Sequence, residues 1–321
     1  QDILAAEGIA AKHGRDAEID FKVKVKHEME LREDDQGRVD FKELHLVENV
    51  VTGQILAEKI PAERGVEGKT LFNRILPARD GKDMDLKPGK HTILSQDGMK
   101  ITAEINGQVV LTNGRLSVDE VYRVAGDVGP KSGNVMFLGS VHIGGSVLDN
   151  YEVKAAGNIE IRGSVQKAMI EGEGEIIIQA GVMGREEAVI ESTGGSVIAK
   201  FIQSAKIVAA QDVNVQESIM HSHIEAGNQV VCSGKRAQIV GGVIRATKEV
   251  KARIIGSQAY TATQITVGTD PRILNQYEDL SKLVTSTDTE LKEKQREKST
   301  LEMRQKNDPE TFGIEQVRRL K

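Results

Sequence analysis

The sequence predicts a mainly β protein whose central part, from about Phe137 to Ile255, is a parallel β-solenoid. Three observations support this prediction. An aliphatic residue recurs seven times at intervals of 16 to 21 residues. Small and β-branched residues alternate with polar residues around each recurrence, as in strands that are buried on one side. Glycine is frequent, with 32 residues against 6 prolines and no tryptophan, which is typical of a fold with many tight corners.

The repeat consists of short segments that align with one another, such as Ala155–Ile159 and Gly172–Ile176. Their last residue is always aliphatic, and the seven residues at this position are Val141, Ile159, Ile176, Val197, Val213, Val230 and Val250. A helical repeat would need about twice this spacing. Because side chains alternate between the two faces of a strand, the aliphatic residues share the inward face. Stacking the turns about 4.8 Å apart joins these faces in one continuous core.

A second strand is predicted in each turn, ahead of the first. Its inward residues lie two positions before five of the aligned segments and are Val153, Ile170, Ile207, Ile224 and Ile244. Two irregular spacings predict loops that project outward, at Ala180–Ser192 and Gly234–Gly241. The open ends of a solenoid carry unpaired backbone groups, which invite end-to-end polymerisation unless another element covers them.

The chain divides into three predicted domains. Residues 1–125 contain strand-like runs at Ile19–Val25, Val47–Ile60 and Ile101–Leu111, separated by glycine turns. These runs predict a compact β-rich domain with one or two small barrel-like units, whose last strands continue into the first turn of the solenoid and cap it. The solenoid domain follows at residues 126–268, and a coiled-coil-like helical segment at residues 269–321.

The helical segment is predicted to form a hairpin. Asp270-Pro271 and Asp308-Pro309 each place an N-cap acid before a proline at the first helical position. An interrupted heptad seam runs through Tyr277, Leu280, Val284, Leu291 and Leu301. We expect the tip near Asn307–Pro309, with the hairpin packed on itself rather than in a long dimeric coiled coil.

Charge and composition exclude several classes of protein. The net charge is −5, with basic and acidic residues interspersed, which argues against binding nucleic acid or a membrane surface through bulk charge. No apolar run approaches the length of a membrane span, so we expect no membrane insertion. The single cysteine, Cys232, excludes an internal disulfide and fits a reducing cytosol. The chain begins at Gln1 and ends within a charged helical pattern, so we expect a fragment of a longer protein.

Three motifs invite a chemical function, and each also has a structural interpretation. Gly65–Thr70 is similar to a phosphate-binding loop, but Glu63 stands where that motif needs its first glycine, which favours a turn between strands. His221 and His223 lie two apart on an outward strand face, a spacing that metal sites use, but aligned positions in the neighbouring turns offer no third ligand. The alternation of side chains places Cys232 on the inward face of its strand. It is therefore predicted to be a buried thiol with a raised pKa, which fills space and is not a nucleophile. We therefore assign no catalytic, cofactor-binding or metal residue.

Several ordered motifs resemble the bacterial flagellar assembly protein A (FapA) family. They are Gly53–Pro61, Gly65–Thr70, Pro77–Lys82, Asp97–Gly98, Ile105–Val110, Ala199–Ile202, Ile219–Ile224, Ile239–Arg245, Ile255–Ser257 and Val267–Pro271. The resemblance covers nearly the whole chain. It implies a central right-handed β-helix between an N-terminal β domain and C-terminal helices, in a cytoplasmic protein tied to flagellar assembly or polar organisation. It brings no catalytic residue with it.

These observations favour a non-enzymatic scaffold or adaptor that binds flagellar or polar proteins through outward side chains of the solenoid. The candidate contact residues are Arg162, Lys167, Lys200, Lys206, His221, His223 and Arg253. A second interpretation is a bactofilin-like polymer of stacked solenoids, against which the large flanking domains argue; a homo-oligomer is left open. A third is a carbohydrate-active or acyl-transfer enzyme, but the chain lacks the hexapeptide period of the acyltransferases, and its outward charges are scattered.

Overall fold

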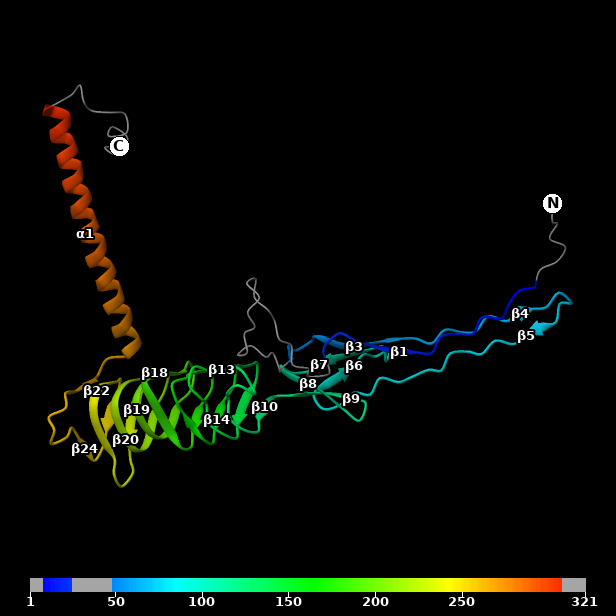
Figure 1. Ribbon diagram of the computed structural model, residues 1–321, viewed down its shortest axis with the longest axis horizontal. Coiled ribbons are helices and arrows are strands. Elements are labelled where there is room, and N and C mark those ends of the chain that lie inside the picture. The colour runs from blue at the N-terminus through cyan, green and yellow to red at the C-terminus, as the bar shows by residue number, and fades with distance from the viewer. Residues whose placement is uncertain (1–7, 25–47, 308–321) are drawn as a thin grey trace.

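The computed structural model describes residues 8–24 and 48–307, which form an elongated molecule of three parts (Figure 1). Small antiparallel sheets and a long arm make up the N-terminal part, a β-solenoid the centre, and one helix the C-terminal part. The arm extends beyond one end of the solenoid, and the helix leaves the other end. The mainly β fold class with a central parallel solenoid is thereby confirmed.

The N-terminal part contains two antiparallel sheets that share a small core. The strands are β1 (Glu18–Phe21), β2 (Asn49–Val50), β3 (Ile55–Ile60), β6 (Thr92–Leu94), β7 (Lys100–Ala103), β8 (Gly107–Thr112) and β9 (Arg115–Asp119). One sheet has the order β1-β3-β7-β6 and the other β2-β8-β9. Leu56, Ile101 and Val109 belong to the buried cluster of this part. Each of the three predicted strand runs overlaps at least one of these strands.

The expected compact shape was wrong for residues 8–16 and 62–82, which together form the long arm (Figure 1). Its three extended backbone segments lie so close that a Cβ on Gly14 would come within 1.9 Å of the Glu63 carbonyl oxygen. The glycines of the arm therefore allow its backbone segments to pack closely. From the sequence alone, the same glycines predict turns of a compact domain. Near the far end of the arm β4 (Gly68–Lys69) pairs with β5 (Ile75–Leu76). The Gly65–Thr70 motif is therefore an extended segment that contains β4, and the turn predicted there lies just after it, at Leu71 and Phe72.

A continuous sheet of 16 parallel-paired strands winds into the solenoid. The strands are β10 (Val121–Val124), β11 (Val135–Phe137), β12 (Ser140–Ile143), β13 (Glu152–Ala155), β14 (Ile159–Ile161), β15 (Ser164–Val165), β16 (Met169–Gly172), β17 (Ile176–Ile178), β18 (Gly181–Ser192), β19 (Val197–Ala209), β20 (Val213–Ala226), β21 (Gln229–Cys232), β22 (Gln238–Ala246), β23 (Glu249–Lys251), β24 (Ile254–Ile255) and β25 (Thr263–Val267). Only Glu120 separates β9 from β10, so the N-terminal strands run directly into the first turn, as expected.

Three stacks of apolar side chains form the solenoid core. The first contains all seven predicted residues, in register from Val141 to Val250, with Tyr122 next to Val141 at its N-terminal end. The second contains the five predicted residues together with Val135, Ile190 and Ile265. The sequence pattern did not reveal the third stack, which is Val128, Val147, Val165, Val182, Ile202, Ile219, Ile239 and Ile255. A turn therefore has three faces, and its inward positions are filled on each of them.

Both predicted outward loops need correction. Residues Ala180–Ser192 do not form a loop, because Gly181–Ser192 is strand β18. Its extra length is taken up by a register shift between Met183 and Ala188, where two residues adopt positive φ. A bulge at a corner absorbs an insertion without breaking the flanking ladder. In the second case Gln238 already begins strand β22, which leaves only a short turn at residues 233–237.

One helix, α1 (Pro271–Asn307), follows the solenoid. It begins as predicted, because the Asp270 carboxylate accepts a 2.9 Å hydrogen bond from the Arg272 amide. The seam residues Tyr277, Leu280, Val284 and Leu291 are each more than half exposed. Helix α1 ends at Asn307, where the hairpin tip was predicted to begin; the rest of the tip and the second arm of the hairpin, at residues 308–321, lie outside the described residues.

Candidate protein-binding groove

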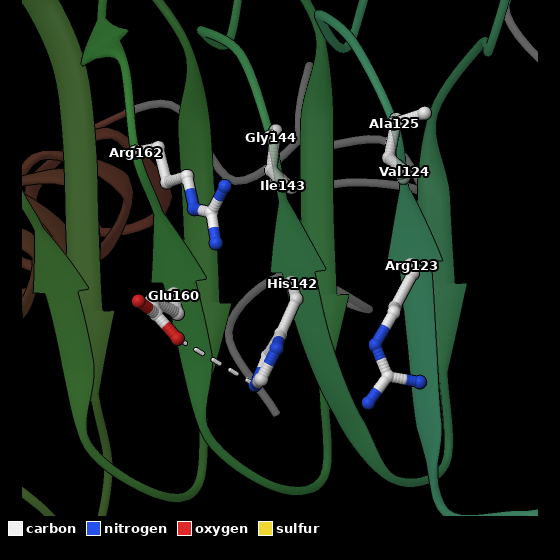
Figure 2. Close-up of a pocket in the computed structure, with 8 residues that line it drawn as sticks. All are labelled: Arg123, Val124, Ala125, His142, Ile143, Gly144, Glu160 and Arg162. Carbon is white, nitrogen blue, oxygen red and sulfur yellow. Dashed lines mark ion pairs between the residues drawn. The ribbon is translucent and has the colours of Figure 1, made fainter.

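A groove of about 290 Å³ lies across the first three turns of the solenoid (Figure 2). Its lining comes from β10, β12 and β14 and from the corners that follow them: Arg123, Val124, Ala125, His142, Ile143, Gly144, Glu160 and Arg162. Solenoid stacking assembles this surface, because equivalent positions in successive turns are hydrogen-bonded neighbours.

The strand register places three polar side chains in a row along the groove. Arg123 is the ladder partner of His142, and His142 is the ladder partner of Glu160. All three point outward because Val124 and Ile143 occupy the alternate, buried positions. Figure 2 shows the row crossing three adjacent strands.

The acidic end of the row is already engaged. His142 Nε2 lies 3.7 Å from Glu160 Oε2, which is an ion pair when the imidazole is protonated. On the other side, Gln179 Nε2 donates a 2.8 Å hydrogen bond to Glu160 Oε1. Glu160 is thus held between two neighbours, and its charge is partly compensated within the solenoid.

The two arginines of the groove are available for a ligand. Arg123 and Arg162 are exposed, and neither guanidinium has a hydrogen-bond or ion-pair partner within the described part of the chain. In Figure 2, Arg162 lies at the end of its strand, above Glu160, and Arg123 stands on the opposite side of His142. A guanidinium binds a carboxylate through two parallel N–H bonds. The groove therefore offers these two guanidinium groups to an acidic ligand.

The other predicted lysine and arginine contacts do not gather at this groove. Lys167 pairs with Glu187 at 2.5 Å, and Lys200 lies 3.6 Å from Glu217. Lys206 is exposed on β19, and Arg253 is exposed in the last turn. The predicted set is therefore spread along the solenoid, and among these residues only Arg162 lines the groove.

The two histidines face outward, as predicted, but the chain turns between them. His221 adopts a φ of 49°, and Ser204 and Gly241, at the same corner of the neighbouring turns, also have positive φ. His223 lies on the next face, next to Lys206 and Val243. No group of three His, Cys, Asp or Glu side chains that could hold a metal occurs among residues 8–24 and 48–307.

His223 belongs to a polar cluster that anchors helix α1 and that the sequence did not predict. Its Nε2 lies 2.8 Å from Glu225 Oε1, and Asn275 of the helix donates a 2.8 Å bond to Glu225 Oε2. Arg245 contacts Glu225 at 3.4 Å and Glu278 of the helix at 3.1 Å. The only sequence signal was a pair of charged residues, at 225 and 245, at equivalent positions of adjacent turns.

The carboxylate at the centre of this cluster is ionised. Glu225 is only 5% exposed, and burial alone would raise its pKa. The hydrogen bonds from His223 and Asn275 and the charge of Arg245 outweigh that effect, so the pKa of Glu225 is lowered. The cluster therefore fixes the first turns of the helix against the last turns of the solenoid.

Cys232 lies inside the solenoid, as its parity predicted, and is 1% exposed. Burial raises the pKa of its thiol, although a backbone hydrogen bond from Gln238 acts in the opposite direction. Such a thiol fills space and is a poor nucleophile at neutral pH.

Family models cover almost the entire chain. The model of the flagellar assembly protein A β-solenoid domain matches residues 120–320, and the model of the N-terminal region of the same family matches residues 1–114. Neither the curated proteins nor the solved structures contain a match. Within the described residues, no helix is long and apolar enough to cross a membrane.

Proposed function

Because the chain belongs to the flagellar assembly protein A family, we propose that it is a non-enzymatic scaffold of bacterial flagellar assembly, which acts by binding other proteins. Family membership supports a role related to flagellar assembly. The scaffold mechanism, the cytoplasmic location and a place at the cell pole are part of the proposal. Its partners would be flagellar or polar proteins.

The groove with Arg123 and Arg162 is the observation that carries this proposal. Both guanidinium groups project from a stacked sheet whose inner face is buried in all three turns, so the backbone that carries them is already ordered before a partner binds. Preorganisation of this kind lowers the entropic cost of association. We propose that an acidic segment of the partner lies across the groove, with carboxylates on the two arginines.

The test compares two charge-matched double variants of the full chain. Arg123→Glu with Arg162→Glu reverses the groove, and Lys235→Glu with Arg236→Glu makes the same charge change in an exposed turn far along the solenoid. Each immobilised protein is used to capture flagellar proteins from a flagellated host. We expect the groove variant to retain at least tenfold less of the specific partner, and the turn variant to retain as much as the wild type. Equal capture by both variants would exclude the groove as the docking site.

One observation favours a homo-oligomer, although a dimer rather than the polymer of the alternative interpretation. Ile254 and Ile255 in the last turn are 55% and 53% exposed, so helix α1 does not cover this end of the solenoid. At the other end, Val128 is fully buried, and Asn49 bonds to the backbone of Met136 and Leu138. Within residues 8–24 and 48–307, only the C-terminal end of the solenoid is therefore open for stacking, which favours a tail-to-tail dimer over a long filament. Sedimentation over a range of concentrations distinguishes a monomer, a dimer and a filament.

A further inference from the structure

The turn between β4 and β5 carries two large apolar side chains at the far end of the arm. Leu71 is 60% exposed and Phe72 is 87% exposed, and no described side chain covers either of them. The arm holds them well away from the solenoid (Figure 1). Leu71 and Phe72 are therefore available for a contact with something outside the molecule.

The backbone of this turn is ordered. The Thr70 amide donates a 2.8 Å bond to the Arg74 carbonyl, and the Asn73 amide donates a 2.9 Å bond to the Thr70 carbonyl. Thr70 Oγ1 also accepts a 3.1 Å bond from the Arg74 amide. Asn73 adopts a φ of 58°, which asparagine tolerates better than most residues. The turn therefore presents Leu71 and Phe72 from a hydrogen-bonded backbone, which lowers the ordering cost of a contact there.

Basic residues surround the apolar turn. Lys69 precedes Leu71 and Phe72, and Arg74 follows them; both are exposed or half-exposed and lack an ion-pair partner in the described part of the chain. Over the whole arm, Lys and Arg outnumber Asp and Glu by 7 to 4, although the entire chain has a net charge of −5. The arm thus bears a charge opposite to that of the molecule as a whole.

We infer that this turn docks on an anionic lipid surface, with Leu71 and Phe72 entering the headgroup region and Lys69 and Arg74 contacting acidic headgroups. The turn is narrow and convex. A protein partner would need a matching apolar pocket to cover it, whereas a bilayer adapts to its shape. Apolar side chains with flanking cations are the combination that binds an anionic interface. The sequence argued against membrane insertion and against binding a membrane surface through bulk charge. The proposed contact needs neither a membrane-spanning segment nor the net charge of the whole chain, because it depends on two apolar side chains and two local cations.

Because the chain has no tryptophan, a single substitution supplies a site-specific reporter. Phe72→Trp places an indole at the tip, and Tyr260→Trp, at a residue that is 96% exposed in the last turns of the solenoid, is the matched control. Each protein is titrated with vesicles of phosphatidylcholine alone and with vesicles that contain phosphatidylglycerol. We expect a blue shift and protection from an aqueous quencher for the tip reporter with the anionic vesicles only. An unshifted tip reporter, or an equal shift of the control, would overturn the inference.

Two further variants separate the apolar and the charged contributions. Leu71→Ser with Phe72→Ser should lower vesicle co-sedimentation by more than tenfold, since each side chain loses its buried area. Lys69→Gln with Arg74→Gln should lower it by about fivefold per cation at low salt and by less at high salt. Unchanged co-sedimentation of the serine variant would refute the lipid contact. A tip-reporter shift that grows with protein concentration without vesicles would assign the surface to a second copy and would also refute it.

Discussion

The polar cluster beneath helix α1 yields the sharpest test of the structure. Glu225→Gln keeps the shape of the side chain and removes its charge. The carboxylate accepts bonds from His223 and Asn275 and faces Arg245 at 3.4 Å. A charge-assisted hydrogen bond is stronger than a neutral one by about 1 kcal/mol. With three such contacts, Glu225→Gln should lower the free energy of unfolding by about 2–3 kcal/mol.

This decrease in the free energy of unfolding should be present at neutral pH and disappear in acid. Because the folded state lowers the pKa of Glu225, the carboxylate stabilises the fold above its unfolded pKa of about 4.3. That contribution disappears as the pH falls through the lower folded pKa. Wild type and variant should therefore differ in urea unfolding at pH 7 and converge in acid.

Hydrogen exchange supplies the local readout. Amides in the first turns of helix α1 should exchange faster in Glu225→Gln at pH 7, because Asn275 and Glu278 tie these turns to the solenoid through the cluster. Glu173→Gln, a change at an exposed residue of an early turn, is the control and should alter neither measurement. Equal stability and equal exchange of Glu225→Gln and wild type at pH 7 would refute the assignment of the cluster as the anchor of the helix.

Three other predictions address the core, the arm and the thiol. Ile207→Ala in the second stack should lower the free energy of unfolding by about 2–5 kcal/mol, whereas Ile254→Ala, at a half-exposed residue, should lower it far less; chemical denaturation compares them. Gly81→Ala should open the arm to limited proteolysis, because its Cβ would lie 1.9 Å from a carbonyl oxygen, and Gly126→Ala, with nothing within 4 Å, should not. Cys232 should react with iodoacetamide at pH 8 only after unfolding, because it is buried and its thiol pKa is raised; rapid alkylation of the folded protein would contradict its inward position.

The proposed roles of the solenoid and the arm are separable. The groove lies in the first three turns, and the apolar turn lies at the far end of the arm. Substitutions at Arg123 or Arg162 should leave vesicle binding unchanged, and substitutions at Phe72 should leave partner capture unchanged.

Local periodicity alone determined the solenoid. The alternation of inward and outward side chains depends only on strand geometry, so the stack from Val141 to Val250 and the inward position of Cys232 could be predicted without tertiary information. The third stack was missed because many of its strands are short and lie next to corners, where positive φ angles interrupt the alternation. The bulge in β18 was predicted as a loop for a related reason, since an insertion has the same length whether it leaves the sheet or stays in it.

Only the tertiary structure decided where the polar groups meet. Glu225 and Asn275 are 50 residues apart and belong to a strand and a helix, so no spacing in the sequence predicts their contact. The groove needs the register of three turns to bring Arg123 and Glu160 into one row. The arm depends on glycines that pack against the backbone of segments far away in the chain, as Gly81 does against Arg15. A side-chain pattern records which face of a strand is buried, but it does not record which distant segment covers it.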